Sequence, residues 1–142
     1  MKKILCVCIG NSDRSPSMAA ILSLFIPGIT GTFFESAGIG ESAASGGSAS
    51  PFAIEACRLI GKDITKHKRR HVDQILDLID YDLFICADEK CAEEVVKRGI
   101  DPEKIYNANI PNPWPVHFQE DYNAVFKKIL STMFRIVIRY FS

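Results

Sequence analysis

Residues 4–16 read ILCVCIGNSDRSP, and this stretch decides the fold of the chain. Its first five residues form an unbroken apolar run, which is typical of a short strand buried on both faces in a parallel sheet. Gly10 and Asn11 then interrupt the run and predict a tight loop. Ser15 followed by Pro16 predicts the start of a helix, because serine is a good N-cap and proline fits the first helical position. A buried strand, a tight loop and a helix therefore follow one another directly.

The remainder of the chain continues this alternation. Further apolar runs predict strands, and segments with helical spacing or cap signals predict helices between them. The C-terminal segment is expected to form a long amphipathic helix against the sheet. Alternating strands and helices predict an α/β fold: one domain over residues 1–142, with three layers α/β/α and a four-stranded parallel sheet. Strands are expected at 4–8, 32–36, 83–87 and 104–107, and helices at 15–25, 50–60, 72–79, 89–98 and 122–137.

Composition limits the classes of function. The chain has 142 residues, 47% of them hydrophobic, which is enough for the core of one domain. Its 17 basic and 17 acidic residues balance, which argues against a general nucleic-acid binder. The five cysteines include no C-x-x-C pair, so no structural zinc site is expected. No apolar run reaches the roughly 18 residues of a membrane-spanning helix or resembles a complete signal peptide. We therefore expect a cytoplasmic protein with reduced cysteines and no membrane partner.

The loop after the first strand has the residues of an anion-binding site. A strand, a tight loop and a helix start direct several backbone N–H groups at one point, where the helix dipole also favours negative charge. Arg14 closes a Cys-x5-Arg pattern and offers a planar fork to two oxygens of a tetrahedral anion. The same positive field favours the thiolate form of Cys8, and Ser15 can donate a hydrogen bond to that sulfur. The sequence thus predicts an enzyme that binds a phosphate-like oxyanion and attacks it with Cys8.

Residues 8–16 resemble the signature loop of the low-molecular-weight protein tyrosine phosphatases and of the related thioredoxin-coupled arsenate reductases. This likeness implies the low-molecular-weight phosphatase fold for the whole chain. The segments that extend the likeness, in the same order as in the family, are Ser36-Ala37-Gly38, Ala49-Ser50-Pro51 with Ala53, His67-Lys68-Arg69-Arg70, Ala87-Asp88 and Ile110-Pro111-Asn112-Pro113-Trp114.

The resemblance implies a phosphatase that hydrolyses phosphomonoesters, either phosphotyrosine protein or aryl phosphate, through a phosphocysteine on Cys8. Its partner would be a phosphorylated protein or a small phosphate ester, with no metal or organic cofactor, and the chain would be a monomer or weak dimer. The implied roles are Cys8 as nucleophile, Ile9, Gly10, Asn11, Ser12, Asp13 and Arg14 as the phosphate-binding loop, Ser15 as an aid to sulfur departure, Asn11, Ser36 and His67 as loop supports, and Trp114 as a substrate wall.

The late loop departs from the family pattern at the position of the general acid. The family carries an aspartate there that protonates the leaving oxygen, whereas this chain has Asn112. An amide cannot give up a proton at neutral pH, and general acid catalysis is typically worth about 10²–10⁴ in rate. Three explanations are open. Glu120, Asp121 or His117 can act instead, the natural leaving group can need little help, or the protein can bind phosphorylated partners with little turnover.

Two further departures lie inside the signature loop. Asp13 stands where many family members have a second cysteine that traps the nucleophile as a reversible disulfide, so that protection is not expected here. Ser12 stands where tyrosine-directed members have a bulky aliphatic residue. Relatives that act on phosphoarginine carry a small threonine there and arsenate reductases can carry serine, so the substrate stays open.

Two alternatives compete with a phosphatase. In the first, Cys8 takes up arsenate and Cys86 and Cys91, which follow the third strand, discharge it as a disulfide. We favour the simpler interpretation, in which Cys86 is a core cysteine on a strand and Cys91 is a cysteine of the following helix. In the second, the chain is a phosphate-binding module with little turnover. The basic run at 66–71 is expected to be a solvated surface turn, although it could also recruit an acidic or phosphorylated partner.

Overall fold

A four-stranded parallel sheet forms the centre of the computed structural model, which describes residues 2–27 and 31–141. The strands lie in the order β2-β1-β3-β4, so the first strand of the sequence is a central one. Cys6 pairs with Ser36 on one side and with Ile85 on the other. The strands are β1 (Lys2–Cys8), β2 (Thr32–Gly38), β3 (Leu83–Cys86) and β4 (Ile105–Asn107).

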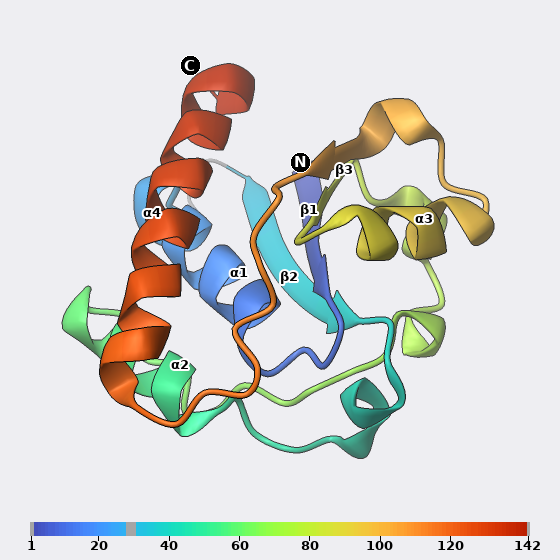
Figure 1. Cartoon of the computed structure of the whole chain (residues 1–142). Coiled ribbons are helices and arrows are strands. Elements are labelled where there is room, and N and C mark those ends of the chain that lie inside the picture. Colours follow the sequence, from blue (N-terminus) through green and yellow to red (C-terminus); the bar gives the residue numbers. More distant parts are fainter. Residues whose placement is uncertain (1, 28–30, 142) are drawn as a thin grey trace.

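Helices cover both faces of the sheet, which confirms the predicted α/β/α fold (Figure 1). Three helices lie on one face and one on the other. On the first face are α1 (Arg14–Phe25), α2 (Pro51–Leu59) and α4 (Gln119–Phe141), and on the second is α3 (Glu89–Lys97). Short 3₁₀ turns complete the connections: η2 (Glu41–Ser45), η3 (Val72–Gln74), η4 (Leu78–Asp80) and η5 (Pro102–Lys104).

The alternation of side chains along β1 divides the core into two. Ile4, Cys6 and Cys8 pack with residues of α1, α2 and α4. Leu5 and Val7 point to the opposite face and pack with residues of β3, α3 and η3. Both faces of β1 are therefore buried over residues 4–8, as the apolar run there predicts. Cys8, the last residue of β1, lies where the strand gives way to the loop.

Two predicted elements differ from the structure. The predicted helix at 72–79 is wrong: the segment forms η3 and η4, with Ile75 extended between them. Eight residues form a marginal helix on their own, and Ile75 is buried while Leu76 is fully exposed, so no apolar face holds a continuous helix together. The start of α1 also differs. The helix begins at Arg14, and the side chain of Ser15 turns toward Cys8 instead of capping it.

Within 2–27 and 31–141, no helix combines the length and the apolar character that crossing a bilayer requires.

Candidate active site

A cleft of about 820 Å³ opens where β1 ends and α1 begins. Four segments form its walls: the loop after β1, the chain around 42–54, Arg69, and the stretch 112–114 before α4. Carboxyl ends of parallel strands are the usual place for a ligand in such sheets. The cleft brings together, from the residues that the sequence suggested, Cys8, Ile9, Gly10, Ser12, Asp13, Arg14, Asn112 and Trp114.

Two hydrogen-bond partners lie next to the sulfur of Cys8 in this cleft. The backbone N–H of Asn11 donates to Sγ at 3.2 Å, and the hydroxyl of Ser15 lies 3.0 Å from the same atom. Ser15 has one hydroxyl proton and a second acceptor, the carbonyl of Ala37, at 3.3 Å. Because Sγ is nearer and a thiolate is the stronger acceptor, the Ser15 proton favours the sulfur once Cys8 is ionised. Cys8 is 3% exposed, so its access is through the cleft.

Arg14 lines the same cleft as Cys8, and hydrogen bonds to one of its nitrogens hold the guanidinium in place. Its Nη1 donates to Oδ2 of Asp88 and to the carbonyl of Ile110, both at 2.8 Å. Nε and Nη2 have no protein partner within the described part of the chain, and Arg14 lines the cleft although it is only 2% exposed. Burial would raise the pKa of Asp88, but hydrogen bonds from the Cys91 N–H and from Arg14 outweigh it and lower this pKa. The charged pair thus holds two guanidinium donors ready for an anion.

Asn11 connects the loop to its surroundings through its whole side chain. Its φ of 55° places it in the left-handed region, where asparagine is one of the few residues tolerated. Nδ2 donates to Ser15 at 2.9 Å and to Ser36 Oγ at 3.0 Å, while Oδ1 accepts from the Arg70 N–H at 2.9 Å. Asn11 is completely buried, so it supports the loop and does not line the cleft.

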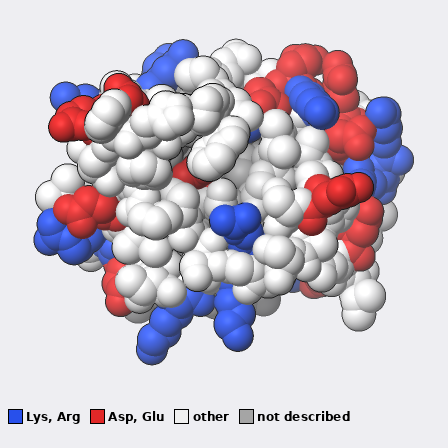
Figure 2. Space-filling model, turned by 60° about the horizontal axis from the view of Figure 1, so that its bottom comes forward, with Lys and Arg blue, Asp and Glu red and all other residues white. Residues whose placement is uncertain are grey.

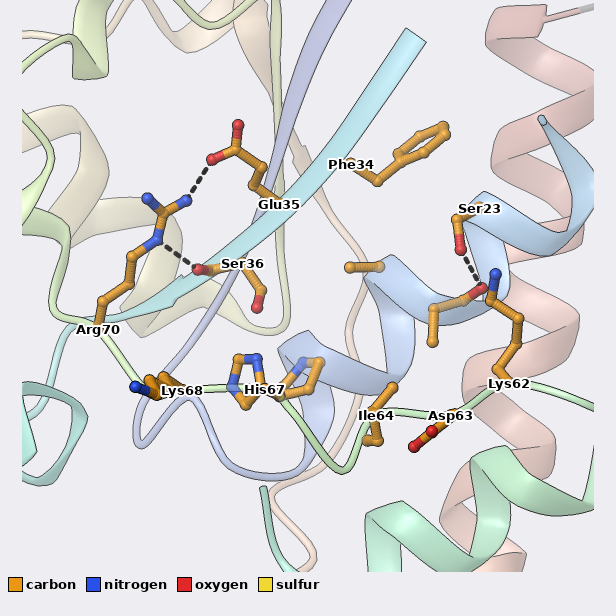
Figure 3. Close-up of a pocket in the computed structure, with 13 residues that line it drawn as sticks. Ser23, Phe34, Glu35, Ser36, Lys62, Asp63, Ile64, His67, Lys68 and Arg70 are labelled. Atoms are coloured by element: carbon orange, nitrogen blue, oxygen red, sulfur yellow. Dashed lines mark hydrogen bonds and ion pairs between the residues drawn. The ribbon is translucent and has the colours of Figure 1, made fainter. Parts of the chain in front are cut away.

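His67 and Arg70 support the loop from the side away from the cleft, next to β2 (Figure 3). His67 Nε2 lies 2.8 Å from the carbonyl of Asn11, so this nitrogen carries the proton and donates it. Burial lowers the pKa of His67, and the charges of Arg69 and Arg70 add to that effect. Arg70 donates to the Ser36 carbonyl and pairs with Glu35, as the dashed lines in Figure 3 show. A neutral His67 is therefore the form that suits this position.

The end of β2 approaches the loop so closely that only glycine fits. A Cβ on Gly38 would lie 2.4 Å from the carbonyl oxygen of Ile9 and 2.7 Å from the Ala43 side chain. This close approach lets the Ile39 N–H donate to the Cys8 carbonyl at 3.0 Å. The Ser36-Ala37-Gly38 segment thus positions the backbone of Cys8.

Asp13 is directed toward hydroxyl groups rather than into open solvent. Its carboxylate accepts from Ser50 Oγ and, at 3.2 Å, from Ser12 Oγ. Ser50 also caps α2 by accepting from the Ala53 N–H at 3.1 Å. From α4, the Tyr122 hydroxyl lies 3.0 Å from the Asp13 carbonyl. These hydrogen bonds stabilise the Asp13 carboxylate, whose charge opposes anion binding, and they connect the loop to α2.

Asn112 and Trp114 line the same cleft as Cys8, on the chain that leads into α4. The Asn112 side chain accepts from the Trp114 N–H at 3.2 Å, which fixes the turn between them. Trp114 is 67% exposed and forms an open apolar wall. The alternative acids suggested by sequence, His117, Glu120 and Asp121, are exposed and do not line the cleft. Their neighbourhood in sequence does not bring them to Cys8.

Cys86 and Cys91 lie on the opposite side of the sheet from Cys8 in the packing of the core. Both are completely buried and free. Burial raises the pKa of Cys86 to about 12, and burial with the nearby Asp88 also raises the pKa of Cys91. Such thiols are poor nucleophiles, so the arrangement does not favour the arsenate reductase relay.

Phe52 and Arg69 are among the cleft residues that sequence reasoning missed. Phe52 forms part of an apolar wall at the start of α2, and Arg69 adds a second cation. The basic run gave a signal for Arg69, but only the fold shows which of its side chains reaches the cleft. Among residues 2–27 and 31–141, no three His, Cys, Asp or Glu side chains gather in a metal-binding arrangement.

The cleft thus combines a cysteine with an arginine fork in the loop between a parallel strand and a helix. The family model for low molecular weight phosphotyrosine protein phosphatase matches residues 3–134, and this chain belongs to that family. The family consists of hydrolases, and the match confirms the resemblance seen in the sequence.

Individual relatives agree with this assignment. The chain is 38% identical over 98 residues to the probable low molecular weight protein-tyrosine-phosphatase EpsP of Ralstonia nicotianae, a match that covers 69% of this chain and 63% of the relative. It is 43% identical over 72 residues to EpsP of Ralstonia solanacearum, covering 51% and 46%. The matched segments thus span less than two thirds of either relative.

Solved structures show the same fold at low identity. Wzb of Vibrio vulnificus in complex with benzylphosphonate matches with a TM-score of 0.81 and 24% identity, covering 97% of this chain and 98% of that one. The tyrosine phosphatase AmsI of Erwinia amylovora matches with a TM-score of 0.83 and 22% identity, covering 99% and 94%.

Proposed function

We propose that this protein hydrolyses phosphomonoesters of phosphotyrosine protein or aryl phosphate type through a phosphocysteine on Cys8. The observation that carries the proposal is the set of hydrogen-bond contacts around Sγ of Cys8. The Asn11 N–H and the Ser15 hydroxyl stabilise negative charge on Sγ, and Sγ faces the same cleft as Arg14. A stabilised thiolate beside two unpartnered guanidinium donors is suited to attack a bound phosphoryl group.

In the first step, the Cys8 thiolate attacks phosphorus and the ester oxygen departs with the bonding electron pair. Arg14 donates to the phosphoryl oxygens, on which negative charge is concentrated in the transition state. Asn112 has no proton to supply, so the leaving oxygen takes its proton from water after it departs. In the second step, water attacks phosphorus, loses its proton to solvent, and the sulfur leaves as a thiolate that receives a hydrogen bond from Ser15.

The test is hydrolysis of a panel of aryl phosphates, an alkyl phosphate and phosphoarginine. Cys8→Ser should abolish hydrolysis, and Arg14→Lys should weaken it because an ammonium cannot provide the two-pronged contact. Mass spectrometry of the acid-quenched reaction should show one added phosphoryl group on Cys8. Hydrolysis that persists in Cys8→Ser would exclude the mechanism.

Asn112 favours a second candidate, a phosphate-binding module with little turnover. In that case inorganic phosphate or a phosphopeptide binds, and Arg14→Ala abolishes the binding, while the panel shows negligible hydrolysis. Substantial turnover of any substrate in the panel excludes this candidate.

A further inference from the structure

The side chains of the basic run at 66–71 point in different directions in the structure. His67 and Arg70 turn inward and support the loop behind Cys8. Lys66 and Lys68 are exposed. Arg69 reaches the cleft that holds Cys8 and Arg14. One side chain of the run is therefore available to a molecule bound in the cleft.

Arg69 is held at the rim by backbone contacts that leave its terminal nitrogens unused. Its N–H donates to the Gly47 carbonyl at 2.8 Å, and its Nε donates to the Ser48 carbonyl at 2.9 Å. Within 2–27 and 31–141, neither terminal nitrogen of Arg69 has a partner, and no carboxylate lies within ion-pair distance. By contrast, Arg14 and Arg70 pair with Asp88 and Glu35. Arg69 thus has a fixed direction and an uncompensated charge.

The charges around the cleft leave a place for a second anionic group. The buried Arg14 and the loop amides suit the phosphoryl group at the base. Asp13, the carboxylate that lines the cleft, is already engaged by Ser50 and Ser12. Figure 2, which brings the bottom of Figure 1 forward, shows a basic group near the centre of this face within a mainly uncharged area, while most of the charged groups lie toward the edges. A cation at the rim of an otherwise weakly charged cleft attracts negative charge next to the bound phosphate.

The walls of the cleft favour a peptide as the carrier of that second charge. Phe52 and Trp114 provide apolar surface for the body of a phosphorylated side chain, and the cleft is far larger than a phosphoryl group. The neighbouring residues of a peptide then lie at the rim, where Arg69 is. A guanidinium with two free N–H groups on one edge matches the oxygens of an aspartate or glutamate side chain.

We infer that Arg69 is a specificity-determining residue that binds an acidic side chain next to the phosphorylated residue of a peptide substrate. The inference rests on the proposed function, because it assumes that the phosphoryl group occupies the Cys8–Arg14 loop. In this inference Arg69 discriminates between substrates and takes no part in the chemical step.

The experiment measures the binding of two fluorescent phosphotyrosine peptides to the Cys8→Ser protein, which cannot turn them over by the proposed route. The peptides are identical except that one carries glutamate and the other glutamine beside the phosphotyrosine. The acidic peptide should bind about fivefold more tightly, as expected for a partly exposed ion pair. Adding Arg69→Gln should remove this preference, Arg69→Glu should reverse it in favour of the glutamine peptide, and raised salt should weaken it.

Lys66→Gln is the matched control, because it removes a cation of the same run that does not line the cleft, and it should retain the preference. The inference is overturned if Arg69→Gln keeps the preference. It is also overturned if this change weakens both peptides equally, since Arg69 would then only hold the chain at Gly47 and Ser48. Hydrolysis of 4-nitrophenyl phosphate by the unmodified protein tests the proposed function separately. Hydrolysis with equal peptide binding overturns the Arg69 assignment alone, whereas charge-dependent binding without hydrolysis overturns the phosphatase proposal alone.

Discussion

Asn11 Nδ2 donates a hydrogen bond to Ser36 Oγ at 3.0 Å, and this contact joins the loop beside Cys8 to the neighbouring strand β2. The same side chain also contacts Ser15 and accepts from the Arg70 N–H. One buried amide thus sets both the position of the loop and the hydroxyl that contacts the sulfur. Stability and catalysis should therefore respond together to its removal.

Asn11→Ala should lower the free energy of unfolding by about 2–4 kcal/mol, because it adds left-handed strain and leaves the Arg70 N–H without its acceptor. Phosphate ester hydrolysis should also fall, since Ser15 and the Asn11 N–H lose their fixed positions relative to Cys8. Urea unfolding and the rate with 4-nitrophenyl phosphate measure the two effects.

Asn109 offers a matched control, because its φ is 52° and its side chain is exposed. Asn109→Ala introduces a similar backbone strain without removing a buried network, so it should cost only about 1 kcal/mol. If both variants lost the same stability and the same activity, the side-chain contacts of Asn11 would not matter as argued.

The five cysteines should differ sharply in reactivity. Cys6, Cys57, Cys86 and Cys91 are completely buried. Burial raises the pKa of Cys57 to about 11 and, likewise, that of Cys86 to about 12. Iodoacetamide should therefore modify one thiol of the native protein, Cys8, through the cleft, and inorganic phosphate should slow the reaction. Peptide mass spectrometry locates the label, Cys8→Ser should take up none, and native-state labelling of Cys57 or Cys91 would contradict the prediction.

The architecture could be predicted because the decisive signals are local. The apolar run that ends at Cys8, the break at Gly10 and the cap at Ser50 each act within a few residues, and the structure has a strand, a loop and a helix start at those places. The prediction of a helix at 72–79 failed because contacts with distant strands bury some side chains of this segment and leave others in solvent. The local sequence pattern does not show which of these side chains are buried.

The candidate site could be predicted to a similar extent, and for a similar reason. The contacts among Cys8, Asn11 and Ser15 arise within one loop and the first turn of a helix. Whether Arg69 or Lys68 points into the cleft depends on how the basic run packs against residues 47–48. In the Arg69–Ser48 contact the two residues are 21 positions apart in the sequence. Long-range pairings of this kind are not visible in residue types alone.

Acid should weaken the protein through His67. Its pKa is lowered in the folded state by burial, whereas in the unfolded chain it stays near the ordinary value of about 6.5. Between these two values the unfolded chain binds more protons, so stability increases with pH there. The His67 contribution should be complete above about pH 6.5, should decline as the pH falls below it, and should be lost below the folded pKa.

Urea midpoints between about pH 5 and pH 7.5 measure this dependence. His67→Gln keeps an N–H donor near the position of Nε2 but cannot titrate, so it should flatten the profile in this range. His117→Gln makes the same replacement at an exposed histidine and serves as the matched control. A wild-type profile that did not fall with acid, or an identical fall in His67→Gln, would contradict the argument.

Asn112 provides the most direct test of how the leaving group departs. Asn112→Asp introduces a carboxyl group of the same side-chain length into the cleft that holds Cys8. If this position serves the leaving oxygen, the rate should rise by about 10²-fold or more for alkyl and high-pKa phenolic esters, which need a proton most. Esters of acidic phenols should gain little, because their oxygens leave readily as anions. The dependence of rate on leaving-group pKa should thus be steep in the wild type and shallow in Asn112→Asp. Asn109→Asp adds the same charge outside the cleft and should change neither slope nor rate. An Asn112→Asp protein with the wild-type slope would show that Asn112 does not face the departing oxygen.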